Sequence, residues 1–159
     1  MDVKNAFLHG ELHVVIYMKP PRGYNQAQPD MIFSFRKSLY GLKRGPRAWY
    51  VQINSYLLNL GFKRSCNEAT LYIRLQNDDF LLVSLYVDDL LVTGSSTQSI
   101  KDFREQMKKV FEMNDLGKMT YFLGMEVNQS SQGIFVSRKK YAIEILKKFC
   151  LDKCKPVST

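Results

Sequence analysis

The sequence is poor in the residues that build zinc sites and disulfide frameworks. Cysteine occurs three times, as Cys66, Cys150 and Cys154, and histidine occurs twice. Three cysteines are an odd number with no histidine nearby, so the pattern argues against a four-ligand zinc site. Free thiols in a reducing intracellular compartment are the simpler expectation.

Long apolar runs are also missing. No stretch reaches the roughly 18 apolar residues that a membrane-spanning helix needs, and the first residues do not resemble a signal peptide. The chain has neither internal repeats nor a low-complexity linker. We therefore expect one globular domain without a membrane partner, because 159 residues with 45% hydrophobic side chains can form a real core.

Acidic residues are outnumbered, and the imbalance is uneven along the chain. There are 23 Lys and Arg against 15 Asp and Glu, a net charge of +8. Residues 1–50 have eight basic and three acidic side chains, residues 51–100 have three and five, and residues 101–159 have twelve and seven. An acidic middle between basic flanks suits a protein that holds a polyanion around a metal-loaded centre. The alternative is a domain that is basic only for solubility.

Hydrophobic periodicity predicts helices that alternate with antiparallel hairpins. The expected strands are 14–18, 31–35, 69–75, 80–87, 90–93, 119–127 and 133–137, and the expected helices are 46–60, 97–111 and 138–149. Ser96 or Thr97 is expected to cap the second helix. The third helix is expected to bury Ala142, Ile145, Leu146 and Phe149. This pattern indicates the α+β class, with one antiparallel sheet and helices on one face.

The segment Tyr86–Asp89 places two adjacent carboxylates inside an apolar run that extends from Phe80 to Thr93. Burying an unpaired carboxylate is costly, so the pair needs a turn, a counter-ion or a metal. The alternative is a hairpin whose exposed tip happens to be acidic, as we expect for Asn77–Asp79.

A third carboxylate, Asp2, begins the segment Asp2–Phe7, which has the pattern of a strand end that enters a tight turn. If that segment lies beside the 80–93 hairpin, Asp2 joins Asp88 and Asp89, and three like charges so close require cations. Mg²⁺ prefers such oxygen ligands, and two ions can assist an in-line displacement at a phosphate. This chemistry needs no histidine, so His9 and His13 are expected to be loop or surface residues.

Five motifs, in this order, extend the pattern: Asp2–Gly10, Ser38–Trp49, Tyr86–Asp89, Asp115–Gly117 and Tyr121–Glu126. Together they closely resemble the reverse transcriptase domain of Ty1/copia-type LTR retrotransposons, of the kind abundant in plants. The resemblance covers essentially the whole chain, residues 1–159. It implies a right-hand polymerase fold, of which this chain would be the palm, and RNA-directed DNA polymerase activity.

By the same resemblance, Asp2, Asp88 and Asp89 are the catalytic and metal-binding carboxylates. Asp2 and Asp88 would hold two Mg²⁺ ions, with Mn²⁺ as a second candidate, and Asp89 would help more peripherally.

The residues expected to contact the incoming deoxynucleoside triphosphate are Val3, Lys4, Asn5, Ala6, Phe7 and Arg44. Phe7 matches an aromatic steric gate that would collide with a 2′-hydroxyl, whereas without the motif it would be a plain core aromatic. Arg44 stands where family members usually have glutamine, and its charge can pair with a phosphate or its bulk can obstruct the site.

The residues expected to contact an RNA or DNA template with its primer are Lys43, Gly45, Arg47, Tyr86, Tyr121, Phe122, Leu123 and Gly124. Basic side chains in 38–49 would meet phosphates, which position a strand without reading its sequence. Residues 121–124 resemble a primer-grip hairpin. The alternatives are a basic solvated loop and an ordinary packed hairpin.

The chain is expected to be truncated at its N-terminus, without fingers, and to stop near Lys155–Thr159 before an RNase H domain. The missing parts of Pol are therefore further expected partners, and the expected location is a cytoplasmic virus-like particle or the nucleus. A catalytically inactive relic that folds and binds nucleic acid non-specifically is the alternative function. A module that is active only after complementation is a third possibility.

Overall fold

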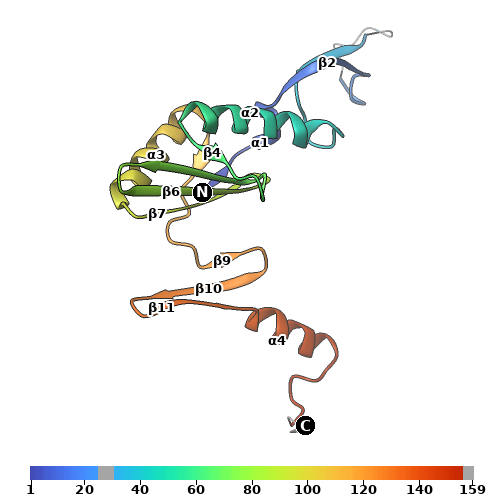
Figure 1. Cartoon of the computed structure of the whole chain (residues 1–159). Helices are drawn as coiled ribbons and strands as arrows, with labels where there is room; N and C mark the ends of the chain where they lie inside the picture. The colour runs from blue at the N-terminus through green and yellow to red at the C-terminus, as the bar shows by residue number, and fades with distance from the viewer. Residues whose placement is uncertain (25–30, 156–159) are drawn as a thin grey trace. The chain divides into compact units, whose positions relative to one another are not determined.

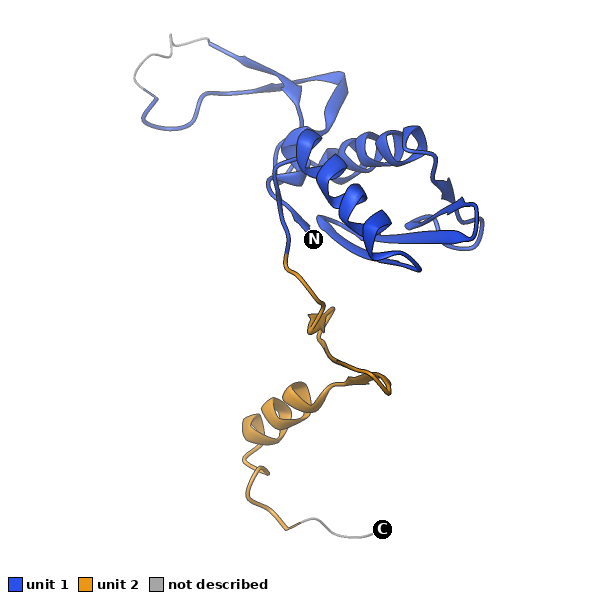
Figure 2. Cartoon of the chain, turned by 90° about the vertical axis from the view of Figure 1, so that its left-hand side faces the viewer, with its two compact units in different colours: residues 1–115 blue, residues 116–159 orange. Residues whose placement is uncertain are grey.

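The computed structural model describes residues 1–24 and 31–155. They form two compact units, Met1–Asp115 and Leu116–Thr159, which are coloured separately in Figure 2. Residues 156–159, part of the tail expected to stop short of an RNase H domain, lie outside the described residues.

The first unit is built on a six-stranded antiparallel sheet with the order β4-β5-β6-β7-β1-β8. Its strands are β1 (Asp2–Val3), β4 (Lys63–Arg64), β5 (Leu71–Gln76), β6 (Asp79–Tyr86), β7 (Asp89–Gly94) and β8 (Met113–Asn114). Two-residue turns join β5 to β6 and β6 to β7, because Gln76 pairs with Asp79 and Tyr86 with Asp89. The meander predicted over residues 69–93 is therefore confirmed to within two residues at each strand end.

Two helices, α2 (Gly45–Asn59) and α3 (Thr97–Val110), cover one face of this sheet (Figure 1). Every second residue of β6 points into the shared core, which also contains Ile53 of α2 and Phe103 of α3. The remaining buried members of this core are Val3, Ala6, Trp49, Leu57, Phe62, Tyr72, Leu81, Val83, Leu85, Leu90, Met107 and Phe111. The buried side chains of α2 and α3 thus face the sheet, whereas Val110 of α3 is half exposed.

Local sequence signals explain the ends of these helices. Gly61 has φ +83°, and the Phe62 amide donates to the Leu57 carbonyl at 3.1 Å, which together form a Schellman motif at the end of α2. The hydroxyl of Ser96 accepts from the Ser99 amide and caps α3. Of the two caps expected for α3, Ser96 is the one that forms.

A short helix and a separate two-stranded sheet complete the first unit. The helix α1 (Ala6–His9) follows β1 directly, and β2 (Glu11–Met18) pairs with β3 (Phe33–Lys37). The first of these strands is longer than predicted, and the second begins two residues later. Both strands expose most of their side chains because they do not join the six-stranded sheet.

The second unit has a three-stranded antiparallel sheet in the order β11-β10-β9 and one helix. Its elements are β9 (Tyr121–Phe122), β10 (Met125–Ser130), β11 (Gly133–Ser137) and α4 (Lys139–Lys148). The prediction of one strand over 119–127 was wrong, because a two-residue turn at Leu123–Gly124 divides it. The predicted burial in α4 was also wrong, because none of its residues is buried.

The α+β class with antiparallel sheets is confirmed for the described residues, which contain four helices because α1 adds to the three predicted. The expectation of a single sheet was wrong, since the described strands form three sheets. The cause is that β2–β3 and β9–β11 each pair only locally along the chain. Across residues 1–24 and 31–155, no helix is long and apolar enough to cross a membrane.

Candidate active site

The carboxylates of Asp2 and Asp89 are brought together by strand pairing. The two residues are direct partners across the antiparallel pair β1–β7. Their chain neighbours Val3 and Leu90 are 1% and 2% exposed and lie in the core. Because side chains alternate between the faces of a strand, Asp2 and Asp89 both point to the face opposite α2 and α3.

The hydrogen bonds around this pair show how closely the carboxylates are held. Met1 and Leu90 exchange two backbone hydrogen bonds, of 2.8 and 2.9 Å. Asp2 and Asp89 are therefore a non-hydrogen-bonded pair, in which the Cα atoms of partners lie about 4.5 Å apart and side chains are closest. Like charges directly opposite each other at such a position destabilise a sheet. A cation between them would remove that cost.

Asp88 lies in the two-residue turn between β6 and β7. Its carbonyl accepts a 2.9 Å hydrogen bond from the Val3 amide, which ties the turn to β1 beside Asp2. Val87, the first residue of the turn, has φ +55°. All three acidic residues predicted from the motifs therefore lie at one end of the β7–β1 pair.

The electrostatics of Asp89 reflect this crowding. Partial burial, and then the charges of Asp88 and Asp2, raise the pKa of Asp89 above its ordinary value of 3.8. Both other carboxylates are thus near enough to oppose its ionisation. A positive charge bound at this end of the sheet would reverse that effect.

Asp89→Asn is expected to stabilise the chain near neutral pH. An acid whose pKa is raised on folding adds stability only below its unfolded pKa, and that stability is lost as pH rises through the folded value. The substitution removes this loss, so the free energy of unfolding should rise by up to about 1 kcal/mol at low salt.

Urea unfolding at pH 7 and at pH 3 checks this prediction. The gain should disappear at pH 3, where the Asp89 carboxyl is neutral in both states. An Asp89→Asn chain that is less stable than the unmodified chain at pH 7 would contradict it.

The donor set fits Mg²⁺ shared with a substrate better than a cage made by the protein alone. Among residues 1–24 and 31–155, no three His, Cys, Asp or Glu side chains are grouped closely enough to hold one metal ion. Mg²⁺ is commonly held by one or two carboxylates together with substrate phosphates. Two opposed carboxylates with a third in the adjacent turn match that mode of binding.

The residues expected to face a nucleotide surround α1. Asn5 adopts a left-handed conformation, φ +53°, which turns the chain from β1 into the helix. Val3 and Ala6 are buried. The ammonium group of Lys4 forms an exposed 2.8 Å ion pair with Glu112, the residue immediately before β8.

Phe7 is half-buried and packs against both the core and the 38–45 loop. Its ring centroid lies 4.7 Å from that of Tyr40. A Cβ added at Gly45 would lie 2.8 Å from the Ser38 hydroxyl and 3.1 Å from the Leu39 carbonyl. The close approach that Gly45 permits is therefore internal, and it closes this loop onto the start of α2.

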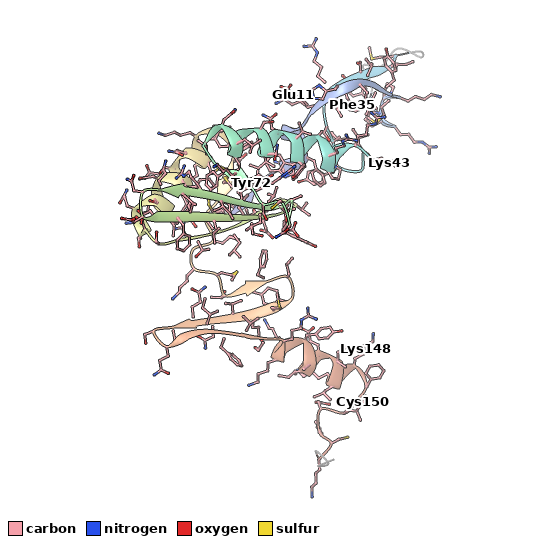
Figure 3. All side chains as sticks on the ribbon, viewed as in Figure 1. Glu11, Phe35, Lys43, Tyr72, Lys148 and Cys150 are labelled. Carbon is pink, nitrogen blue, oxygen red and sulfur yellow. The ribbon has the colours of Figure 1, made fainter. Side chains whose placement is uncertain are left out.

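The basic residues of this loop and of the first turn of α2 are exposed. Lys43, Arg44 and Arg47 all lie in the stretch that enters α2, and Figure 3 labels Lys43 there. Arg44 is the N-cap residue of α2 but makes no capping hydrogen bond with its side chain. These three cations are placed at the positive end of a helix dipole, which adds to their attraction for phosphate.

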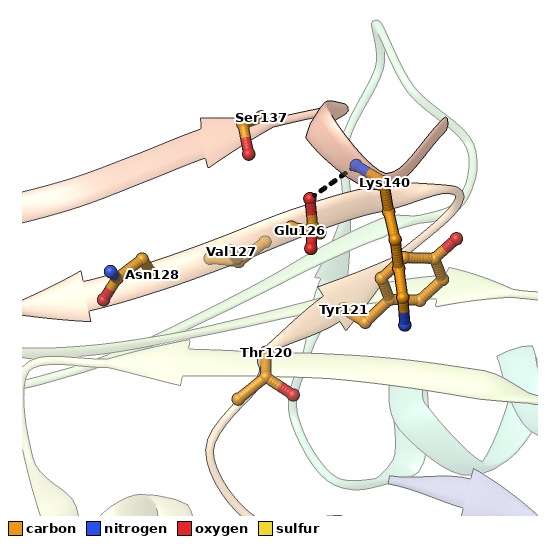
Figure 4. A pocket seen from close by; sticks show the side chains of 7 residues that line it. All are labelled: Thr120, Tyr121, Glu126, Val127, Asn128, Ser137 and Lys140. Carbon is orange, nitrogen blue, oxygen red and sulfur yellow. Dashed lines mark hydrogen bonds between the residues drawn. The ribbon is translucent and has the colours of Figure 1, made fainter. Parts of the chain in front are cut away.

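The expected primer-grip residues form a tight hairpin in the second unit. Leu123 and Gly124 both have positive φ, +49° and +78°, as a type I′ turn requires, and Phe122 is partly buried. Tyr121 lines a cavity of about 430 Å³, shown in Figure 4. Glu126 and Lys140 also line it, and the Glu126 carboxylate accepts from the Lys140 backbone amide at 3.0 Å.

The two histidines and the acidic residue of the fourth motif lie in different surroundings. His9 ends α1 instead of lying in a loop, and it is partly exposed while packing edge-on against Phe111, 5.4 Å between centroids. His13 is exposed on β2 as expected. Asp115, from the fourth motif, forms a 3.3 Å ion pair with Arg104 of α3.

Two further residues at the site were missed because nothing in their local sequence marks them. Trp49 was named only as the last residue of a motif, yet its indole nitrogen donates to the Val87 carbonyl at 2.6 Å. Gly10 was quoted only as part of a motif. A Cβ added there would meet the backbone of Trp49 and Ala48 within 2.7 Å.

Comparison with known proteins agrees with this geometry. The family model described as "Reverse transcriptase (RNA-dependent DNA polymerase)" matches residues 1–159. The chain belongs to this reverse transcriptase family. The match spans both compact units, so each is part of the family's domain. No solved structure matches the chain significantly.

Several curated relatives of this reverse transcriptase chain are named as transposon proteins. It is 36% identical over 160 residues to the retrovirus-related Pol polyprotein from transposon RE2 of Arabidopsis thaliana, covering 100% of the chain and 11% of that protein. It is 36% identical to the retrovirus-related Pol polyprotein from transposon TNT 1-94 of Nicotiana tabacum, and the match covers 100% of the chain and 12% of that protein. The putative transposon Ty5-1 protein of Saccharomyces cerevisiae is 39% identical over 134 residues, and the match covers 84% of the chain and 44% of that protein. The resemblance to Ty1/copia-type elements is thus confirmed, and the chain spans only about a tenth of the plant polyproteins.

Proposed function

We propose that this reverse transcriptase chain is the palm of an RNA-directed DNA polymerase that extends a primer 3′ end by nucleotidyl transfer. The observation that carries the proposal is the direct opposition of Asp2 and Asp89 across β1–β7, with Asp88 in the adjoining turn. A sheet gains nothing from this repulsion, so a function that needs the charges is the natural explanation.

The carboxylates of Asp2, Asp88 and Asp89 would hold two Mg²⁺ ions, which Mn²⁺ can replace. When bound, the two ions assist attack by the primer 3′-hydroxyl and stabilise the departing pyrophosphate. The chain's own part is to hold the carboxylates on one face and at one end of the sheet. Family membership is consistent with this assignment, and the resemblance described above supports it, since Asp2 and Tyr86–Asp89 lie in two of the shared motifs.

Other residues would position the nucleic acid and the nucleotide. Lys43, Arg44 and Arg47 are exposed beside the N-terminus of α2, where phosphates of a template or triphosphate are attracted. Residues Tyr121 to Gly124 would hold the primer strand. The remaining parts of a Pol polyprotein would supply the fingers and the RNase H domain.

Primer extension on an RNA template tests the proposal directly. The purified chain is incubated with a primed homopolymer template, the complementary deoxynucleotide and Mg²⁺ or Mn²⁺. Incorporation that requires the metal supports the proposal. Binding of the primed template without incorporation, and without any Mn²⁺ binding, would favour the second candidate.

That second candidate is sequence-independent nucleic-acid binding without synthesis. The exposed cations before α2 and the net charge of +8 favour it. It predicts binding that weakens steeply as salt rises and that does not respond to Mg²⁺ at the carboxylates. A salt titration with and without Mg²⁺ separates it from the polymerase.

Phe7→Ala is expected to relax the choice of sugar. In the proposed role, the Phe7 ring beside Tyr40 excludes a 2′-hydroxyl by shape, so its removal should lower the preference for deoxynucleotides over ribonucleotides at least about tenfold. The measurement is the ratio of the two kcat/KM values. Because Phe7 also packs on the core, the ratio rather than the rate is the readout.

Phe80→Ala is the matched control. Phe80 is a partly exposed aromatic on β6, at the end of the strand far from the Val87–Asp88 turn. Its loss should leave the ratio unchanged. An unchanged ratio in Phe7→Ala as well would mean that Phe7 is only a packing residue.

A further inference from the structure

The tryptophan of α2 makes a specific contact with the turn that carries Asp88. Trp49 is the single tryptophan of the chain and is 2% exposed. Its indole nitrogen donates to the carbonyl of Val87 at 2.6 Å. The indole is itself held by an edge-on contact with Phe111, 5.4 Å between ring centroids. A rigid, buried donor is therefore fixed against the first residue of the turn.

Val87 needs such support because its backbone conformation is unfavourable. It has φ +55°, which a β-branched residue rarely adopts. Val87 is the first residue of the two-residue turn, and Asp88 has no positive φ. That pattern belongs to the type II′ turn, whose first position is ordinarily glycine.

The same sheet contains a comparison for this turn. The β5–β6 hairpin also has a two-residue turn, Asn77–Asp78, and its first residue has φ +52°. There the chain uses asparagine, which adopts a positive φ more readily than valine does. The turn with valine is the one that the indole of Trp49 contacts. Strain of this kind persists only where surrounding structure enforces it.

We propose that Trp49 is a positioning residue that holds the strained Val87–Asp88 turn and thereby sets Asp88 and Asp89 against Asp2. The turn is tied on one side to α2 through the indole, and on the other to β1 through the Val3 amide and the Asp88 carbonyl, at 2.9 Å. The significance of this placement rests on the proposed function, in which the three carboxylates are the reacting centre.

Amide hydrogen exchange of the whole chain tests the structural step without any metal. Trp49→Phe keeps an aromatic ring but removes the N–H donor. The amides of Val3 and Leu90, which bond across β1 and β7, should then exchange about three- to tenfold faster. The amide of Val83, in the centre of β6, should be unaffected.

Tyr56→Phe is the matched control for this test. Tyr56 lies on the same helix and donates one hydrogen bond to a backbone carbonyl, that of Gln106 at 3.0 Å. Its loss should not alter exchange at Val3. Equal acceleration at Val83 and Val3 in Trp49→Phe would assign Trp49 a general packing role and overturn the proposal.

Mn²⁺ binding, followed by the signal of the free ion, tests the consequence for the carboxylates. Trp49→Phe should weaken Mn²⁺ about three- to tenfold, and adding Val87→Asn should recover most of the loss, because asparagine adopts the turn conformation unaided. Val87 is exposed, so asparagine fits there. No weakening, or no recovery, would overturn the role in positioning. If the unmodified chain binds no Mn²⁺ while the exchange result holds, the proposed metal chemistry fails but the hold of Trp49 on the turn stands.

Discussion

Asp88→Asn is expected to lower Mg²⁺-dependent primer extension by at least about a thousandfold. The charge stabilisation that a metal supplies is worth several kcal/mol, and each 1.4 kcal/mol or so is tenfold in rate. The substitution keeps the size of the side chain and leaves the Asp88 carbonyl, which accepts from Val3, in place. The rate of incorporation and the affinity for Mn²⁺ are the two measurements, and both should fall.

Asp78→Asn is a closely matched control for this prediction. Asp78 is the second residue of the other two-residue turn of the same sheet, as Asp88 is of its own. Both substitutions remove one negative charge from an equivalent turn position. Extension should be unchanged in Asp78→Asn, and extension that persists in Asp88→Asn would exclude the proposed role of the carboxylates.

These two turns also mark what the sequence can and cannot predict. Asn77–Asp79 is identifiable as a turn from residue type alone, because asparagine and aspartate favour such conformations. The turn at Val87 is not, because valine opposes the conformation that it adopts. The ordered motifs pointed to Asp88 there, whereas the local propensity pointed to a continuous strand as far as residue 87.

Strands that form only by pairing with distant segments are also difficult to predict from the sequence. The alternation of apolar residues predicts β6 and β7, yet it contains nothing about β1 or β8, each of which has two residues. Such strands exist only through their partners, and here they set Asp2 opposite Asp89. The sequence made Asp2 a candidate on the condition that its segment lies beside the 80–93 hairpin, and the register of β1 and β7 confirms that it does.

In the second unit the periodicity predicts the helix correctly, but the burial expected for its apolar residues is wrong. The helix α4 forms almost where predicted, and its apolar residues do recur at helical spacing. Periodicity reports that a face is apolar without identifying what covers it. Within the described part of this unit, the one buried hydrophobic residue is Val127 of β10.

Gly10→Ala is expected to lower the free energy of unfolding by about 3 kcal/mol, as overpacking does at its severe end. Gly10 follows α1 with φ −68° and ψ 125°, a conformation open to alanine, so the effect is purely steric. The added Cβ would lie 2.6 Å from the Trp49 amide nitrogen and 2.8 Å from the Ala48 Cβ. Since backbone cannot turn aside as a flexible side chain does, α1 and α2 must separate.

Gly41→Ala provides the comparison, because it has the opposite defect. Gly41 has open space around it but φ +87°, so alanine there costs roughly 1–2 kcal/mol of backbone strain alone. Urea unfolding of the unmodified chain, Gly41→Ala and Gly10→Ala should therefore show that Gly10→Ala is the least stable of the three. Gly10→Ala alone should also speed exchange at the Val3 amide, because the displaced backbone belongs to the residue whose indole holds the Val87 carbonyl. If Gly10→Ala is no less stable than Gly41→Ala, the close approach of α1 to α2 does not determine where Trp49 lies.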